Sequence, residues 1–428
     1  MSFQLPQTHS LKILTSDGRL LFVTRMLRMF AYGFLAVILA LYLAQVGLTA
    51  KKIGLLLTLT LAGDTVVSLW ITTAADRVGR RRMLVAGAGL MLFAGLLFVL
   101  TNDFTLLLIA ATIGVISPSG YEVGPFLPIE QAALTQTVPI TYRTRVFAWY
   151  NLAGSFTTAL GALFGGVLAQ AFMKVGMAPA GSYRIIILLY AAIGIILGIF
   201  FTRLSPAVEP PANNRPLGAS ALSSRLGLHS SLRIVLKLSS LFALDAFAGG
   251  FVIQSIVAYW FHIRFGIGPG LIGGIFFGAN MLAGFSALAA VKVASRIGLV
   301  RTMVVTHIPS NILLILVPLM PNLKLAIAVL MLRFSISQMD VPTRQSYTLA
   351  VVNPDEASAA AGVTGIARTT GASLSPVLAG LLLGSPALLG APFFLAGGLK
   401  IVYDILLYRG FRSIRPPEEK TAHKDSAS

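Results

Sequence analysis

Charged side chains lie inside several long apolar stretches of this sequence. Asp64 interrupts the apolar run 52–75, and Glu122 lies between Pro118 and Pro125 in the run 104–127. Later apolar runs contain Arg333, Asp340, Arg344, Arg368, Lys400 and Asp404. A charge in an apolar medium is unfavourable by about 3 kcal/mol or more, so each of these groups needs a partner or a water-filled cavity. Groups of this kind bind ions or transfer protons.

Proton transfer requires a group that gains and loses a proton near the working pH. Burial moves a carboxyl group toward that range, whereas a nearby arginine opposes the change. Glu122 is our first candidate for proton coupling, because two prolines interrupt its helix and broken helices line cavities. Asp64 is the second candidate. The alternative is that either acid is a fixed counter-ion of Arg333 or Arg368.

The run 323–346 has one polar face. At about 100° per residue, Arg333, Ser337, Asp340 and Arg344 fall in one narrow stripe, which predicts that this stripe faces a cavity. Pro342 lacks a backbone N–H and distorts the helix there. Our candidates for the substrate cavity are Arg333, Asp340, Arg368 and Gln254.

Two further patterns favour structural roles. Lys400 and Asp404 are four residues apart, so they can neutralise each other along one helix face, although a functional role stays open. His262 and His307 are single histidines in apolar surroundings, which favours packing over metal ligation. The absence of cysteine excludes disulfides, thiolate metal sites and cysteine nucleophiles. We therefore expect no metal site, no cofactor and no enzymatic mechanism.

The elements that position these groups are helices of membrane length. Of the 428 residues, 56% are hydrophobic and 11% are charged, whereas about a quarter are charged in soluble domains. Apolar runs of about 20 residues predict an all-α polytopic membrane protein. We expect twelve spans, of which the fourth and tenth continue as helix beyond the membrane, at 22–46, 52–75, 82–101, 104–127, 145–171, 184–203, 238–262, 270–293, 302–320, 323–346, 357–383 and 390–408.

Residues 204–235 interrupt this pattern. The segment is rich in Pro, Ser, Asn and Arg, which predicts a linker between two six-helix bundles, 1–203 and 236–411, with a flexible tail at 412–428. Most of the 33 Lys and Arg residues fall on the side of the linker and both termini, which are therefore predicted to be cytoplasmic. We attribute the net charge of +18 to the lipid surface rather than to nucleic acid. We expect a monomer in the plasma (inner) membrane.

The two predicted bundles contain matching residues. Tyr42 recurs as Tyr259, Gly54 recurs as Gly273, and DRVGRRR at 76–82 recurs as SRIGLVR at 295–301. The offset between matching positions is nearly constant, which indicates an internal duplication with a central site between the halves.

At two matching positions the charge changes sign. Arg28 corresponds to Asp245, and Glu130 corresponds to Arg344. We predict that Glu130 and Arg344 form a cytoplasmic gate pair across the two halves, and that Arg28 and Asp245 belong to the same gate. The alternative is that each charge meets lipid headgroups or a partner in its own half.

Residues 72–82 read TTAADRVGRRR and connect the second and third predicted spans. This loop resembles the signature loop of the major facilitator superfamily of secondary transporters. The family usually has Gly and Leu where this sequence has Thr72 and Ala74, whereas the charged part is complete. The signature positions are Asp76, Arg77, Gly79, Arg80 and Arg81.

The resemblance implies two six-helix bundles that expose a midplane site alternately to either side. The small-residue segments 161–169 and 375–384 allow close helix packing. The first is similar to an antiporter signature of exporters, although it lacks the usual proline. We expect a proton-coupled exporter of small organic molecules. The alternatives are an uptake symporter or exchanger of an organic anion held by Arg333 and Arg368, and a membrane sensor or scaffold without transport.

Overall fold

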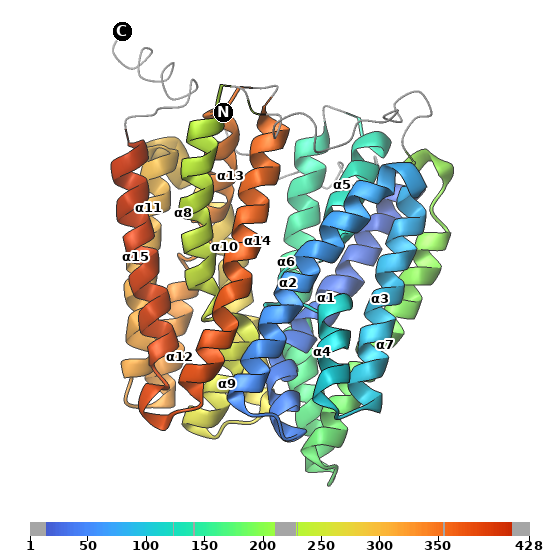
Figure 1. Ribbon diagram of the computed structural model, residues 1–428, viewed down its shortest axis with the longest axis vertical. Helices are drawn as coiled ribbons and strands as arrows, with labels where there is room; N and C mark the ends of the chain where they lie inside the picture. The colour runs from blue at the N-terminus through green and yellow to red at the C-terminus, as the bar shows by residue number, and fades with distance from the viewer. Residues whose placement is uncertain are drawn as a thin grey trace. The chain divides into compact units, whose positions relative to one another are not determined.

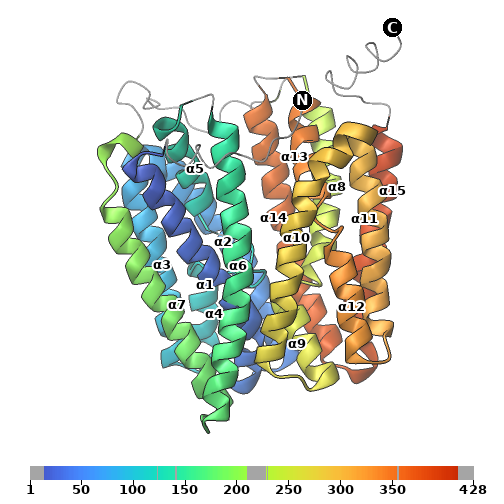
Figure 2. The ribbon, with the colours of Figure 1, turned by 180° about the vertical axis from the view of Figure 1, so that it is seen from behind.

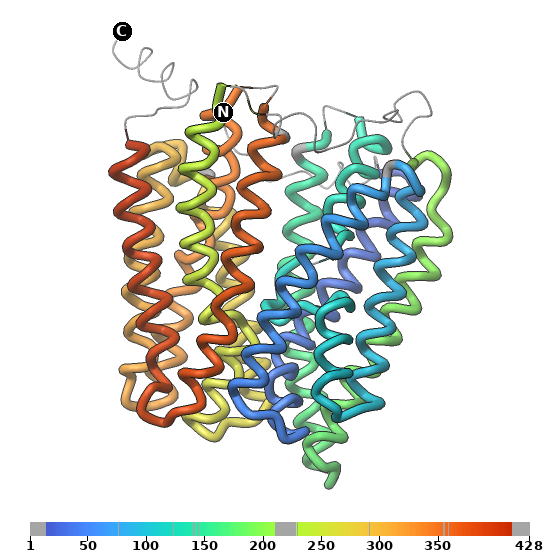
Figure 3. Tube along the Cα trace, in the orientation of Figure 1, coloured from blue at the N-terminus to red at the C-terminus, as the bar shows by residue number. Residues whose placement is uncertain are grey.

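The computed structural model describes residues 14–122, 124–139, 142–209, 228, 230–353 and 356–412, except the side chains of Asp76, Thr144, Val291 and Ser358. Within these ranges every regular element is a helix (Figure 1), which confirms the all-α prediction. Ten of the twelve predicted spans correspond to helical segments long and apolar enough to cross a membrane. Figure 3 traces the same path as a tube.

The long segments begin and end close to the predicted limits. They are α1 (Ser16–Gln45), α2 (Ala50–Val78), α3 (Arg80–Leu100), α6 (Arg143–Lys174), α7 (Pro179–Thr202), the consecutive α8 (Leu232–Gly250) and α9 (Gln254–Phe265), α10 (Pro269–Ile297), α11 (Leu299–Leu316), α14 (Ala357–Leu383) and α15 (Ala391–Phe411). Short 3-10 helices are η3 (Pro206–Val208), η6 (Val317–Leu319) and η7 (Pro386–Leu388).

The fourth and tenth spans are each divided into two helices, in keeping with the interruption expected from their prolines, and the second helix of each continues past the predicted limit. The fourth consists of α4 (Phe104–Ile113) and α5 (Phe126–Thr137), and the tenth of α12 (Leu323–Phe334) and α13 (Asp340–Ala350). In the first break, Gly120 and Gly124 have φ angles of 72° and 82°, which helical residues cannot adopt. Pro125 then directly precedes α5. In the second break, α13 begins at Asp340, two residues before Pro342. The N–H groups in the first turn of a helix have no partner within the helix, so the N–H that proline lacks is not needed there.

Contacts within the chain define two compact units. The first unit comprises 1–49, 62–217 and 257–277, and the second comprises 50–61, 218–256 and 278–428. In the first unit, α1 packs along α6 and α7, and α3 packs along α7. In the second, α8 packs along α14 and α15, and α11 packs along α15. Most of the predicted linker and the tail after 412 lie outside the described residues, so the predicted domain limits stay a prediction.

Each unit contains one very close helix crossing between glycines. In the second unit, Gly54 near the start of α2 meets Gly380 of α14, and a Cβ added to Gly380 would lie 2.4 Å from the Ala50 carbonyl oxygen. In the first unit, where α6 lies along α1 (Figure 2), Gly166 of α6 meets Gly273 near the start of α10. A Cβ on Gly166 would lie 2.8 Å from the Gly273 Cα. Both small-residue segments therefore pack closely, as predicted, and at positions related by the internal repeat.

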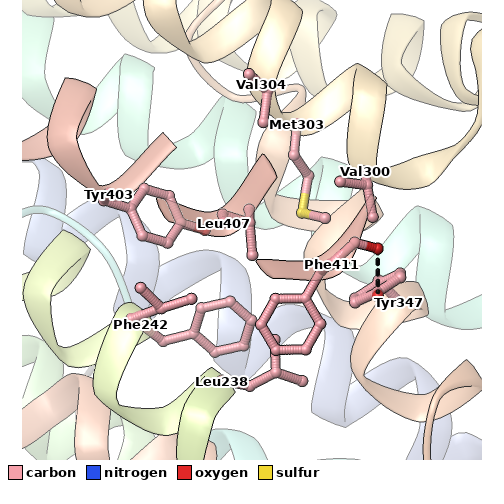
Figure 4. Packing of buried hydrophobic residues seen from close by; sticks show 10 residues of the cluster. Leu238, Phe242, Val300, Met303, Val304, Tyr347, Tyr403, Leu407 and Phe411 are labelled. Carbon is pink, nitrogen blue, oxygen red and sulfur yellow. Dashed lines mark hydrogen bonds between the residues drawn. The ribbon is translucent and has the colours of Figure 1, made fainter. Parts of the chain in front are cut away.

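An apolar cluster packs four helices of the second unit together. Phe242 of α8, Met303 of α11, Tyr347 of α13, and Tyr403 and Phe411 of α15 are all buried in it (Figure 4). The Tyr347 hydroxyl donates a hydrogen bond to the Phe411 carbonyl oxygen at 3.4 Å. This cluster holds α8, α11, α13 and α15 in fixed register, so that charged residues on their neighbouring turns can meet.

Candidate functional site

A fully buried ion pair in the first unit joins α1 to α5. The Arg28 guanidinium donates two hydrogen bonds of 2.7 Å to the two carboxylate oxygens of Glu130. Neither side chain has any exposed surface. Paired, parallel hydrogen bonds of this kind are the strongest arrangement between arginine and a carboxylate. Arg28 and Glu130 therefore fix the start of α5 against α1.

Glu122, in the break between α4 and α5, completes this cluster. Its carboxylate accepts a 2.9 Å hydrogen bond from Arg28 Nε and lies 3.4 Å from Arg25. The first unit thus holds two cations and two acids in direct contact. Within this unit, the cations that pair with Glu122 are Arg25 and Arg28. A counter-ion role for Arg333 or Arg368 stays a prediction.

Aromatic side chains surround the same cluster. The Tyr150 hydroxyl of α6 donates a 2.5 Å hydrogen bond to Glu130, and the Arg25 guanidinium lies 4.3 Å from the centre of the Tyr150 ring. The Arg28 guanidinium lies 4.5 Å from the Phe126 ring. The sequence analysis missed Arg25 and Tyr150. Arg25 could have been found because it precedes Arg28 by three residues and so shares its helix face.

The second unit contains a corresponding cluster around Asp245 of α8. Its carboxylate lies 3.0 Å from Arg344 Nη1 and 2.5 Å from Lys400 Nζ. Arg344 also pairs with Asp340, one turn earlier on α13, at 3.1 Å. Asp340 and Arg344 therefore share a site, as their predicted stripe required.

Lys400 and Asp404 do not form the predicted pair. Lys400 extends to Asp245 of α8, and Asp404 instead lies 2.8 Å from His307 Nδ1 and accepts a 3.0 Å hydrogen bond from Asn311 of α11. His307, which was expected to be a packing residue rather than a metal ligand, also bridges two carboxylates, because its Nε2 lies 3.9 Å from Asp245. Sequence spacing favoured the contact along the helix, whereas tertiary packing supplied partners on other helices.

The residues with exchanged charge are paired within each unit. Arg28 of α1 binds Glu130 of α5, and the matching Asp245 of α8 binds Arg344 of α13. The two ion pairs occupy matching positions with opposite polarity. This corresponds to the own-half alternative of the sequence analysis. A gate between Glu130 and Arg344 stays a prediction.

The remaining candidates lie outside these clusters. Asp64 is half-buried on α2 and accepts a 3.3 Å hydrogen bond from Ser68, and no cation of the described residues lies within ion-pair distance of it. Arg368 on α14 is half-buried, and the described residues offer it no hydrogen bond or ion pair. Arg333 lies 4.9 Å from the Phe334 ring. Gln254 is buried and accepts a 3.3 Å hydrogen bond from Asn280.

The signature loop begins α3. Gly79 has a φ of 115°, a left-handed conformation that glycine adopts freely, and precedes the first helical residue. Glu209 accepts hydrogen bonds from the backbone N–H groups of Arg80 at 2.7 Å and Arg81 at 3.1 Å, so a distant carboxylate caps the helix. Arg80 also donates to the Val208 carbonyl. Arg77 is exposed, and the side chain of Asp76 lies outside the described residues.

Membrane-length helices, two broken spans and buried ion pairs at repeated positions are features of secondary transporters. The family model of the Major Facilitator Superfamily matches residues 21–376. The chain belongs to this superfamily of membrane transporters, which confirms the resemblance read from the signature loop.

Known proteins extend this comparison. The chain is 31% identical to the uncharacterized membrane protein YJR124C of Saccharomyces cerevisiae, over 92% of this chain and 94% of the relative. It is 32% identical to a Na(+), Li(+), K(+)/H(+) antiporter of Planococcus maritimus over 36% of this chain and 35% of that protein. The crystal structure of the nucleoside transporter NupG superposes with a TM-score of 0.70 at 13% identity, covering 93% of this chain and 99% of that one.

Proposed function

We propose that this protein is a proton-coupled exporter of small organic molecules that works by alternating access. Membership of the superfamily supports transport. Exchange against protons is supported by the partial similarity to an antiporter. The proposal rests on one observation: Asp64 is an acid inside a membrane helix, and it has no cationic partner among the described residues.

An unpaired carboxylate in a membrane helix is stabilised by protonation, because its ionised form lacks a compensating charge. Among the described residues, the Ser68 hydroxyl is the one side chain that donates a hydrogen bond to Asp64. Glu122, in contrast, lies against two cations, Arg25 and Arg28. We therefore assign the proton-coupling role to Asp64 and the role of a fixed counter-ion to Glu122, which reverses the order expected from the sequence.

The test is transport by the purified protein in proteoliposomes with an imposed pH gradient. Fluorescent organic cations and organic anions are screened separately, and Na⁺ and K⁺ are included because of the antiporter relative. We expect Asp64→Asn to abolish the dependence of transport on the gradient. Asp103→Asn is the matched control, because Asp103 is exposed at the start of α4 and asparagine retains its capping role. Gradient-driven transport that persists in Asp64→Asn contradicts the assignment.

A second function, uptake or exchange of an organic anion, is favoured by Arg368. An arginine on α14 without a direct partner among the described residues is suited to bind a carboxylate or phosphate. If the protein transports organic anions preferentially and this preference disappears in Arg368→Gln, the result would support this second function over proton-coupled export of small organic molecules. Absence of flux for every class, in protein that remains folded, would favour the sensor or scaffold alternative.

The orientation and setting also belong to the proposal. The distribution of Lys and Arg supports cytoplasmic termini in the plasma membrane, and the protein is expected to act as a monomer. Labelling of cysteines introduced near each end, in intact and in permeabilised cells, tests the orientation. Labelling of either end from outside intact cells would contradict it.

A further inference from the structure

The short segment after α7 connects the starts of two membrane helices in the first unit. At its beginning, the Ser205 backbone N–H donates a 3.0 Å hydrogen bond to Asp17 Oδ1, and the Ser205 hydroxyl donates one of 2.5 Å to Asp17 Oδ2. Asp17 belongs to the first turn of α1. At the end of the segment, Glu209 accepts hydrogen bonds from the first two backbone N–H groups of α3. The segment 205–209 therefore joins α1 to α3.

Ser205 also lines a cavity of about 370 Å³ at the start of α3. Arg81 and Arg82 of the signature loop line the same cavity, and both side chains are exposed. Arg81 Nη1 donates a 3.4 Å hydrogen bond to the carbonyl of Leu204, the residue directly before Ser205. The cavity thus brings one serine together with two arginines, whose guanidinium groups match the geometry of a phosphate.

We propose that Ser205 is a phosphorylation site and that Arg81 and Arg82 bind its phosphoryl group. The donor is ATP, and the catalyst is a protein kinase of the proline-directed class. The Ser205 oxygen forms a bond to the γ-phosphorus, the bond from that phosphorus to the bridging oxygen breaks, ADP leaves with the electron pair, and the hydroxyl proton passes to a base of the kinase. The proposal rests on the cytoplasmic side proposed above for the linker, where ATP and kinases are present.

Sequence and exposure together select this serine. Proline directly follows serine at four positions, Ser117, Ser205, Ser375 and Ser385. Ser117 and Ser375 have no exposed surface, and Ser385 follows the eleventh predicted span, on the side opposite the linker. Ser205 has an extended backbone, with φ of −76° and ψ of 166°, and Pro206 after it is exposed. Kinase access requires the contact with α1 to open, which is a local event at the end of a helix.

Phosphorylation reverses the attraction between Ser205 and Asp17. The hydroxyl loses the proton that it donates to Asp17, and the phosphoserine carries a charge of about −1.5 to −2. The Asp17 carboxylate repels this charge, whereas Arg81 and Arg82 attract it through charge-assisted hydrogen bonds. Glu209 lines the same cavity and opposes the binding, so both arginines are needed. Phosphorylation therefore releases α1 from the segment, which moves toward the signature loop.

The site is tested with the full-length protein in detergent, where both faces are accessible, by incubation with a cyclin-dependent kinase and ATP. We expect mass spectrometry to find phosphate on Ser205 and to find it lost in Ser205→Ala. Pro206→Ala retains the hydroxyl but removes the proline, so it should lose the phosphate as well. Folded wild-type protein without phosphate on Ser205 overturns the proposal, and equal phosphorylation of Pro206→Ala overturns the kinase class.

The role of the two arginines is tested by ³¹P nuclear magnetic resonance of the phosphorylated protein. The second pKa of phosphoserine is about 6, and cations that bind the dianion lower it. We expect Arg81→Gln combined with Arg82→Gln to raise the titration midpoint by about 1 pH unit. Arg77→Gln is the matched control, because Arg77 is an exposed arginine of the same loop that does not line the cavity. Equal midpoints in the wild type and the double variant overturn the arginine site.

The release of α1 has its own measurement. The Ser205 amide donates its proton to Asp17, so its hydrogen–deuterium exchange should become faster after phosphorylation. Asp17→Ala should produce the same change in the unmodified protein. Unchanged exchange in the phosphorylated protein overturns the release. None of these experiments uses transport or requires a sealed membrane, so failure of this site is distinguishable from failure of the proposed export or orientation.

Discussion

Arg28 of α1 and Glu130 of α5 form a bidentate ion pair, with both nitrogen–oxygen distances at 2.7 Å. Asp245 and Arg344 repeat this link between α8 and α13, with the acid and the base exchanged. A break in a membrane helix leaves the following segment without the backbone hydrogen bonds that would position it. In both units, an ion pair fixes this segment in place: it joins α5 to α1 in the first unit and α13 to α8 in the second.

Removal of Arg28 leaves the buried Glu130 and the half-buried Glu122 without their main partner. We expect Arg28→Ala to destabilise the protein by about 3–5 kcal/mol, the usual effect of breaking a buried ion pair from one side. Thermal unfolding of the purified protein in detergent measures the change. Arg19→Ala, at an exposed position on the same helix, is the control and should have little effect. A loss below about 1 kcal/mol, typical of surface pairs, would show that water reaches Glu122 and Glu130.

The partner of Glu130 can be identified by double-mutant cycles. Glu130→Gln combined with Arg28→Gln should give a coupling energy of about 0.5–3 kcal/mol, as residues in contact do. Glu130→Gln combined with Arg344→Gln should be additive in stability. The predicted gate has its own readout: recovery of transport in Glu130→Arg with Arg344→Glu, absent from each single variant, would show that the two residues meet during the cycle.

The same approach separates the two candidate partners of Lys400. Lys400→Met should couple strongly to Asp245→Asn, because these side chains are in contact at 2.5 Å. Its coupling to Asp404→Asn should be smaller, since Asp404 binds His307 and Asn311. Unfolding of the four variants of each cycle measures both energies. A larger coupling with Asp404 would restore the pair that sequence spacing favours.

The glycine crossing of α2 and α14 should tolerate no added carbon. A Cβ on Gly380 would lie 2.4 Å from the Ala50 carbonyl oxygen, so Gly380→Ala should destabilise the protein by about 1–3 kcal/mol through overpacking. Gly365→Ala is the matched control on the same helix, because no atom lies within 4 Å of its added carbon. This control should be neutral or more stable by up to about 1 kcal/mol, since alanine favours helix. Equal effects of both substitutions would argue against the close crossing.

The sequence by itself determined the helical class, ten of the membrane-length segments, the signature loop and the repeat, because these follow from local hydrophobicity and spacing. Glu122 and Arg28 were also recognisable, since a charge in an apolar run is conspicuous wherever it lies.

Only the tertiary structure decided which charges pair. The partners of Arg28 and Lys400 lie 102 and 155 residues away in the chain. Spacing along one helix could suggest only Asp404 as the ion-pair partner of Lys400. For the residues at which the charge changes sign between the repeats, the sequence allowed a partner in either half. Ion pairs act over a few ångströms in any direction, so their partners depend on how helices distant in sequence pack together.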